Sequence, residues 1–189
     1  MKLLPVLLLS LLGCSLLPPA LAEAPLALGE LRPPGRLLML RHASAPGFGD
    51  PPQFALDDCA TQRNLDAAGR AQARRLGERL RAAGLARARV WSSQWCRCLE
   101  TARLLDLGPV EALPALNSFF DRPARREPTL AALRAFLAGL PTDGAPVILV
   151  THQVVIDAFA PGGTPSGGGS LFQLDGSGAP RWLGRIADE

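Results

Sequence analysis

The chain has 189 residues, with 20 lysine or arginine and 17 aspartate or glutamate residues, and a formal net charge of +3. This length suffices for one domain with its own hydrophobic core, so the fold requires neither a metal nor several disulfides. The charges nearly balance and no basic run alternates with aromatic residues, so we expect no nucleic-acid partner.

The first 22 residues have the three parts of a secretory signal peptide. Lys2 is followed by a leucine-rich stretch, and Ala20-Leu21-Ala22 offers a small-x-small cleavage site. We therefore expect a mature domain over residues 23–189, in the periplasm or secreted. Two alternatives stay open. One is a retained membrane helix, which prolines and a glycine within the short apolar run disfavour. The other is a bacterial lipobox that acylates Cys14 and so anchors the protein to the membrane.

Three cysteines remain after removal of this leader, namely Cys59, Cys96 and Cys98. In an oxidising compartment we expect one disulfide, between Cys59 and either Cys96 or Cys98. The Cys-x-Cys spacing is shorter than the spacer of a zinc site, so we expect no metal.

The only two histidines each follow an uninterrupted apolar run. Residues 37–40 lead into Arg41-His42, and residues 147–151 lead into His152. Such runs are typical of parallel strands that are buried on both faces. Because ligands bind at the carboxyl ends of such strands, the two histidines are expected to meet there.

The other elements follow from periodicity and from turn residues. After a proline-rich lead-in and the first strand, residues 43–63 form a long loop that we expect to roof the site. Arg97 is expected in the first turn of a helix capped by Ser92-Ser93, where free N–H groups favour an anion. The remaining predicted elements are helices over 65–83, 94–107, 130–140 and 154–159, a strand over 88–91, loops over 110–121 and 162–169, and edge strands over 170–174 and 180–186.

Two arginines and two histidines arranged in this way suit a phosphoryl group. Guanidinium groups of Arg41 and Arg97 bind phosphate oxygens in pairs and remain charged. A neutral imidazole of His42 attacks phosphorus and gives a phosphohistidine, while His152 stabilises the transition state. The reaction also needs a carboxylic acid that protonates the leaving alcohol.

Four blocks of the sequence resemble, in order, the motifs of the histidine phosphatase (phosphoglycerate mutase-like) superfamily. They begin at Leu40-Arg41-His42-Ala43, Asn64-Leu65-Asp66, Ser92-Ser93 and Val150-Thr151-His152, with alanine replacing the glycine of the first motif. The resemblance implies a three-layer α/β/α domain with a mostly parallel central sheet and no cofactor. It also implies that Arg41 and Arg97 bind phosphate and that His42 is the nucleophile.

The insert at residues 57–64 and the block Trp95-Cys96-Arg97-Cys98 resemble small exported bacterial members, which include lipopolysaccharide core heptose phosphate phosphatases. This implies a small phosphorylated substrate, for which an envelope phosphosugar is one candidate. The chain departs from the pattern at the acid, because Ser118 stands where a glutamate is expected. Asp121 is our candidate, with Asp57, Asp58 or no acid as alternatives.

We therefore predict an exported phosphomonoesterase that works through a phosphohistidine on His42. One alternative is a non-catalytic protein that binds phosphate or a phosphosugar. The other is a phosphohistidine phosphatase or mutase-like activity.

Overall fold

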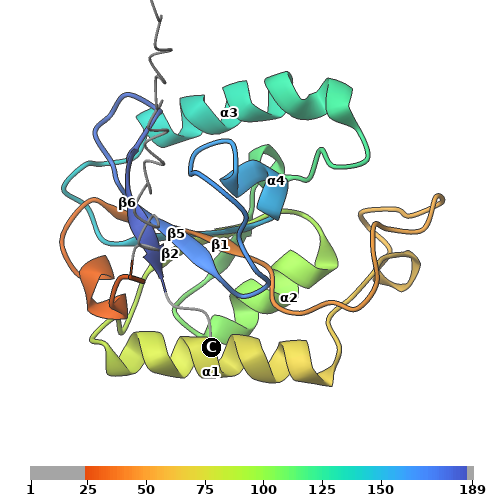
Figure 1. Cartoon of the computed structure of the whole chain (residues 1–189), viewed down its shortest axis with the longest axis horizontal. Helices are drawn as coiled ribbons and strands as arrows, with labels where there is room; N and C mark the ends of the chain where they lie inside the picture. The colour runs from red at the N-terminus through yellow and green to blue at the C-terminus, as the bar shows by residue number, and fades with distance from the viewer. Residues whose placement is uncertain (1–23, 187–189) are drawn as a thin grey trace, which may run out of the picture.

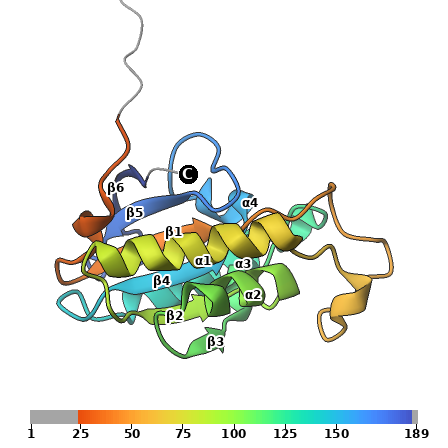
Figure 2. The same cartoon turned by 90° about the horizontal axis from the view of Figure 1, so that it is seen from below.

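Strands β1 (Arg36–Arg41) and β4 (Val147–Thr151), which precede the two histidines, lie side by side and parallel in the middle of a six-stranded sheet. The computed structural model describes residues 24–186; the predicted leader and Cys14 lie outside the described residues. The strand order is β3-β2-β4-β1-β5-β6, and Figure 2 shows the strands stacked in this order. The other strands are β2 (Arg89–Ser92), β3 (Val110–Ala112), β5 (Gly169–Gln173) and β6 (Arg181–Ile186).

Helices cover both faces of the sheet, as Figure 1 shows. On one side lie α1 (Ala67–Ala82) and α2 (Cys96–Leu105), and on the other lie α3 (Arg126–Ala138) and α4 (Gln153–Ile156). Short 3-10 helices are η1 (Leu28–Leu31), η2 (Cys59–Thr61), η3 (Pro114–Leu116) and η4 (Pro123–Arg125). The predicted three-layer α/β/α fold is confirmed.

The apolar run of β1 is continuous because both of its faces are buried. Leu38 and Leu40 belong to the core that includes residues of α1 and α2, whereas Leu37 and Met39 belong to the core that includes residues of α3 and α4. Alternate side chains of a strand point to opposite faces, so a central strand between two helical layers needs apolar residues at every position.

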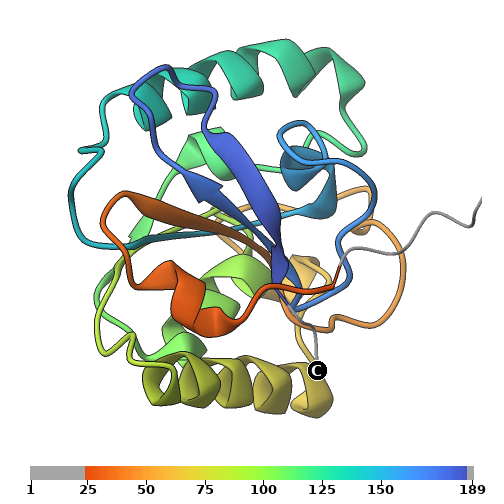
Figure 3. The same cartoon turned by 60° about the vertical axis from the view of Figure 1, so that its left-hand side comes forward.

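Residues 24–35 run alongside the last strand before they enter the sheet. Leu26 N donates to Arg185 O at 2.6 Å, and η1 lies next to α1 (Figure 3). Within residues 24–186, no helix combines the length and the apolar character of a membrane span.

The predicted Ser92-Ser93 cap of α2 is wrong. Ser92 is the last residue of β2, and Ser93 N extends the ladder by donating to Val150 O at 2.9 Å. The helix therefore begins at Cys96, after an extended Trp95, and not at residue 94. Arg97 nevertheless lies in its first turn, as predicted.

Two predictions about the sheet are also corrected. The predicted loop 110–121 contains β3, a three-residue strand paired with β2, which is too short to produce a sequence period. β5 is not an edge strand, because it pairs antiparallel with both β1 and β6. The sheet is still parallel across β3, β2, β4 and β1.

Glycines 167–169, predicted as part of a flexible loop, instead contact the end of β1. Gly167 N donates to His42 O at 3.1 Å, and Arg41 N donates to Gly168 O at 2.9 Å. A Cβ on Gly169 would lie 2.7 Å from Leu38 Cδ1, so only glycine allows this approach. The segment therefore fixes the backbone that carries Arg41 and His42.

Candidate active site

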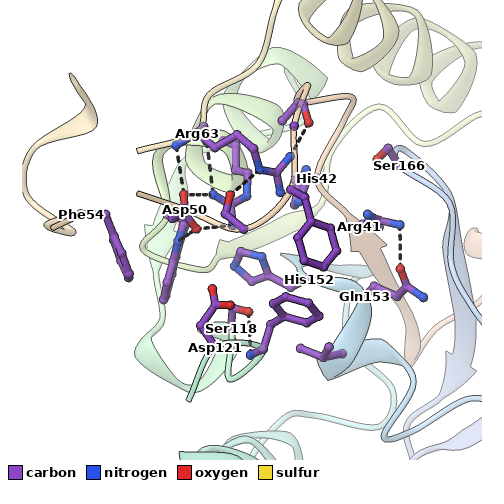
Figure 4. Close-up of a pocket in the computed structure, with 18 of the residues that line it drawn as sticks. Arg41, His42, Asp50, Phe54, Arg63, Ser118, Asp121, His152, Gln153 and Ser166 are labelled. Carbon is purple, nitrogen blue, oxygen red and sulfur yellow. Dashed lines mark hydrogen bonds and ion pairs between the residues drawn. The ribbon is translucent and has the colours of Figure 1, made fainter. Parts of the chain in front are cut away.

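A pocket of about 340 Å³ opens at the carboxyl ends of β1 and β4. Arg41 and His42 line it from the end of β1, His152 follows β4, and Arg97 reaches it from α2. The centroids of the two imidazole rings are 5.6 Å apart. Figure 4 shows the residues around this pocket. The structure thus brings together the four side chains that the sequence placed in one site.

His42 is held in one orientation by its own backbone segment. It is buried, and Nδ1 lies 2.8 Å from Ala43 O, so Nδ1 carries the hydrogen and donates it. The lone pair is therefore on Nε2. Burial lowers the pKa of His42 to about 3; the hydrogen bond to Ala43 opposes this lowering, and the Arg97, Arg41 and Arg63 charges add to it. The imidazole is neutral at physiological pH and is available as a nucleophile.

One nitrogen of Arg41 is anchored by the protein. Nη1 donates to Gln153 Oε1 at 2.9 Å and to Thr164 O at 2.7 Å, which uses both of its hydrogens. Nε is buried, and no partner for it exists within residues 24–186. Burial, opposed by Asp157 and reinforced by Arg97, lowers the pKa of the Arg41 guanidinium. The edge formed by Nε and Nη2 is left for another group.

Arg97 is anchored in a similar way, by a carboxylate. Its Nη1 and Nη2 lie 2.8 and 3.0 Å from the two carboxylate oxygens of Asp50, and Nη1 also donates to Arg63 O at 3.2 Å. Both side chains of this ion pair are 4% exposed. Nε of Arg97 is buried and has no partner in the described part of the chain. One Nη2 hydrogen and the Nε hydrogen are therefore free.

Asp50 connects the loop 43–63 to the start of α2. Its Oδ1 also accepts from Arg63 N at 3.0 Å, and its Oδ2 accepts from Trp95 Nε1 at 3.0 Å. Burial by itself raises the pKa of Asp50, but the hydrogen bonds from Arg97 and Arg63 outweigh it, so the pKa lies below its ordinary value. Asp50 is therefore a permanent carboxylate.

Arg63 adds a third cation to the pocket lining. Its Nε donates to Gly49 O at 2.8 Å and its Nη1 donates to Ala45 O, so the side chain holds the loop above the site. Figure 4 shows Arg63 beside Asp50.

His152 packs against aromatic and polar groups. Its Nε2 lies 3.0 Å from Ser93 Oγ, and its ring meets that of Trp95 edge-on at 5.1 Å. Burial first, and then the neighbouring His42 and arginines, lower the pKa of His152 well below its ordinary value. Nδ1 has no hydrogen-bond partner among residues 24–186 and is the nitrogen left for a ligand.

A family model matches the part of the chain that carries Arg41, His42 and Arg97. It is the model of the histidine phosphatase superfamily (branch 1), and it matches residues 37–120. This similarity supports a phosphatase.

Solved structures share the fold of this chain. The protein histidine phosphatase SixA complexed with tungstate is 21% identical, with a TM-score of 0.58, over 81% of this chain and 97% of that one. A mycobacterial glucosyl-3-phosphoglycerate phosphatase bound to VO3 is 20% identical, with a TM-score of 0.57, over 81% and 98%. A protein from Thermus thermophilus is 21% identical, with a TM-score of 0.57, over 82% and 99%. No curated protein sequence matches the chain.

Of the candidate acids, only Asp121 lies at the pocket. It lines the cavity, and its carboxylate oxygens would be 3.9 and 4.0 Å from a Cβ on Gly49. Asp57 and Asp58 do not line the cavity, and Asp58 Oδ1 instead accepts from Ala60 N at the start of η2. The geometry leaves Asp121 as the candidate from the sequence.

The disulfide joins Cys59 to Cys96, which confirms one of the two expected pairings. It links the loop 43–63 to the first residue of the helix that carries Arg97. Cys98 is a free, buried thiol 3.5 Å from His152 Nε2, and burial raises its pKa to about 12, so it stays protonated. Across residues 24–186, no cluster of three or more His, Cys, Asp and Glu side chains could hold a metal ion.

Sequence reasoning missed Asp50, Arg63 and Gln153, all of which line the pocket. Asp50 and Arg63 lie in a loop without periodicity, and the partner of Asp50 is 47 residues away. Gln153 follows His152 directly, so its position beside a strand end was the one available signal.

Proposed function

We propose that the chain is an exported phosphomonoesterase that hydrolyses a small phosphate ester through a phosphohistidine on His42. The observation that carries this proposal is the pair of free guanidinium edges. Arg41 and Arg97 each have one part anchored by the protein and a Nε that is buried without a partner. A buried donor without an acceptor is costly, so two such donors on residues that line one pocket favour an anion as their partner.

A phosphate group suits these edges by shape and by charge. Nε and Nη2 of a guanidinium form a planar fork that matches two oxygens of a phosphate. Four arginines line this pocket, Arg41, Arg63, Arg97 and Arg122, and their charges exceed those of the two acidic residues there, Asp50 and Asp121, whether or not Asp121 carries its proton. Both histidines are neutral, so the pocket keeps a net positive charge for a phosphate dianion.

The reaction proceeds in two displacements. In the first, Nε2 of His42 attacks phosphorus, the bond between phosphorus and the ester oxygen breaks, and Asp121 gives its proton to the leaving alkoxide. In the second, Asp121 takes a proton from water, the water oxygen attacks phosphorus, and the P–N bond to His42 breaks. Inorganic phosphate leaves, and the imidazole and the acid return to their starting states.

Charge that develops on the phosphoryl oxygens is stabilised by groups already in place. Arg41 and Arg97 are held by Gln153, Thr164 and Asp50, so they need not reorganise during the reaction. Nδ1 of His152 supplies a further contact to these oxygens. Asp50 is not the acid, because its lowered pKa and its ion pair with Arg97 keep it ionised.

Export to the periplasm or medium is part of the proposal. It rests on the signal-like residues 1–22 and is supported by the Cys59–Cys96 disulfide, since such bonds persist in oxidising compartments. The folded domain then comprises residues 23–189. Acylation of Cys14 would anchor the same domain to a membrane.

The experiment compares purified wild-type residues 23–189 with His42→Ala on p-nitrophenyl phosphate. Hydrolysis by the wild type that His42→Ala abolishes supports the proposal. Calorimetry with tungstate tests the alternative that the chain is a non-catalytic phosphate-binding protein. If the wild type binds tungstate but hydrolyses none of a panel of phosphate esters, the chain is a phosphate-binding protein and the proposal is wrong.

A further inference from the structure

Among residues 24–186, the exposed large hydrophobic side chains are Phe48, at 87%, and Phe120, at 46%. Both line the pocket that contains His42 and His152. Their rings meet edge-to-face with centroids 5.1 Å apart. They come from different loops, so chain neighbourhood does not explain why they meet at this place.

The backbone, rather than core packing, holds Phe48 at the pocket. It lies between Gly47 and Gly49, whose φ angles of 94° and 65° fall in the left-handed region. Gly49 O accepts a hydrogen bond from Arg63 Nε at 2.8 Å, which fixes the loop beside the site. A side chain that is 87% exposed gains almost nothing from the hydrophobic effect in the free protein. Its position therefore requires another explanation.

A second pair of aromatic rings, Phe54 and Trp95, lines the same pocket and contacts His152. Phe54 packs on Trp95 at 5.4 Å, and Trp95 in turn contacts the ring of His152 at 5.1 Å. Arg122 stacks over Phe54 at 5.2 Å. Near Phe120, Ser118 Oγ accepts a hydrogen bond from Phe120 N at 3.2 Å.

We propose that Phe48 and Phe120 form the subsite for the organic part of the substrate, and that this part presents a flat apolar face next to the phosphate, as an aryl phosphate does. The inference rests on the proposed function, because it takes the phosphate to lie at His42. Aromatic rings bind other rings through edge-to-face or offset contacts and through buried apolar area. A polyol chain would leave both phenylalanines exposed.

Non-hydrolysable ligands isolate this contact from leaving-group chemistry. Isothermal calorimetry on the mature chain measures binding of methylphosphonate and of phenylphosphonate, which differ in the organic group. We expect phenylphosphonate to bind the wild type at least about tenfold more tightly. Phe48→Ala and Phe120→Ala should each reduce this ratio to about threefold or less, and Phe48→Leu should give an intermediate ratio.

Thermal unfolding of each variant serves as the control for folding. Little change is expected for Phe48, which is 87% exposed, and a modest one for Phe120, which is 46% exposed. Equal binding of the two phosphonates by the wild type, or a ratio that neither alanine variant changes, overturns the inference. The inference is also overturned if sedimentation shows a wild-type dimer that dissociates in both alanine variants while the ratio of the two phosphonate affinities stays unchanged.

The outcome also separates this inference from the proposed function. Selective binding of phenylphosphonate by a protein that hydrolyses no phosphate ester supports the subsite and contradicts the proposed enzyme activity. Hydrolysis without this selectivity supports the enzyme activity and contradicts the subsite. Absence of binding by both phosphonates contradicts both proposals.

Discussion

Replacing Asp50 with asparagine removes the carboxylate that holds Arg97. Asp50 accepts from Arg97 Nη1 and Arg63 N on Oδ1, and from Arg97 Nη2 and Trp95 Nε1 on Oδ2. The amide nitrogen of asparagine is a donor and must replace one of these oxygens. In either orientation it faces one N–H of Arg97 and one N–H of another residue, so two hydrogen bonds are lost.

The magnitude follows from the burial of this ion pair. Each lost bond involves a charged group and leaves a buried donor without an acceptor, and breaking a buried ion pair costs about 3 to 5 kcal/mol. We therefore expect Asp50→Asn to lower the free energy of unfolding by about 3 kcal/mol. Loss of the anchor also lets the Arg97 guanidinium shift, and a displacement of about 1 Å in a positioning group lowers kcat/KM by about 100-fold.

The assay combines urea denaturation with steady-state hydrolysis of p-nitrophenyl phosphate. Asp57→Asn is the matched control, because Asp57 is exposed and does not line the pocket. We expect no effect of that change on either measurement. A different view is that Asp50 competes with the substrate for Arg97. In that case Asp50→Asn lowers KM and strengthens inhibition by inorganic phosphate, and this result would refute the positioning role.

Three further outcomes are expected. Asp121→Asn should slow hydrolysis of alkyl phosphates about 100-fold or more, and p-nitrophenyl phosphate far less, because only a poor leaving group needs the proton; equal effects rule Asp121 out. Cys59→Ser, which opens a disulfide spanning 37 residues, should lower the free energy of unfolding by up to about 4 kcal/mol in denaturant titrations, and reduction of the wild type should lower it by a similar amount. The folded state holds the pKa of His42 at about 3 and an unfolded histidine titrates near 6.5, so the unfolded chain takes up the proton first as pH falls. Stability should therefore decline by about 1.4 kcal/mol per pH unit below pH 6.5 for this group, and His42→Ala should flatten that slope in pH-dependent unfolding.

The strands that carry the site were predictable because their burial is uniform. β1 and β4 have helices on both faces, so each is an unbroken apolar run with an abrupt polar end at His42 or His152. Parallel pairing then brings those two ends together. Arg97 was predictable for a related reason, because a helix start after β2 lies at the same edge of the sheet.

The parts that were missed depend on contacts distant in sequence. Asp50 and Arg97 are 47 residues apart, and no local period marks a residue whose role is to accept hydrogen bonds in a loop. The glycines at 167–169 predicted a flexible loop. Because glycine has no Cβ, Gly169 can instead pack closely against β1. β3 has three residues and depends on its pairing with β2 for its conformation.

The nucleophile is the central claim, and trapping the phosphorylated enzyme tests it most directly. The wild type is mixed with substrate carrying radioactive phosphate and quenched in alkali, where a phosphohistidine survives, and the labelled peptide is sequenced. The account predicts one label on His42 and neither label nor turnover in His42→Ala. A label on another residue, or turnover that persists in His42→Ala, would contradict it.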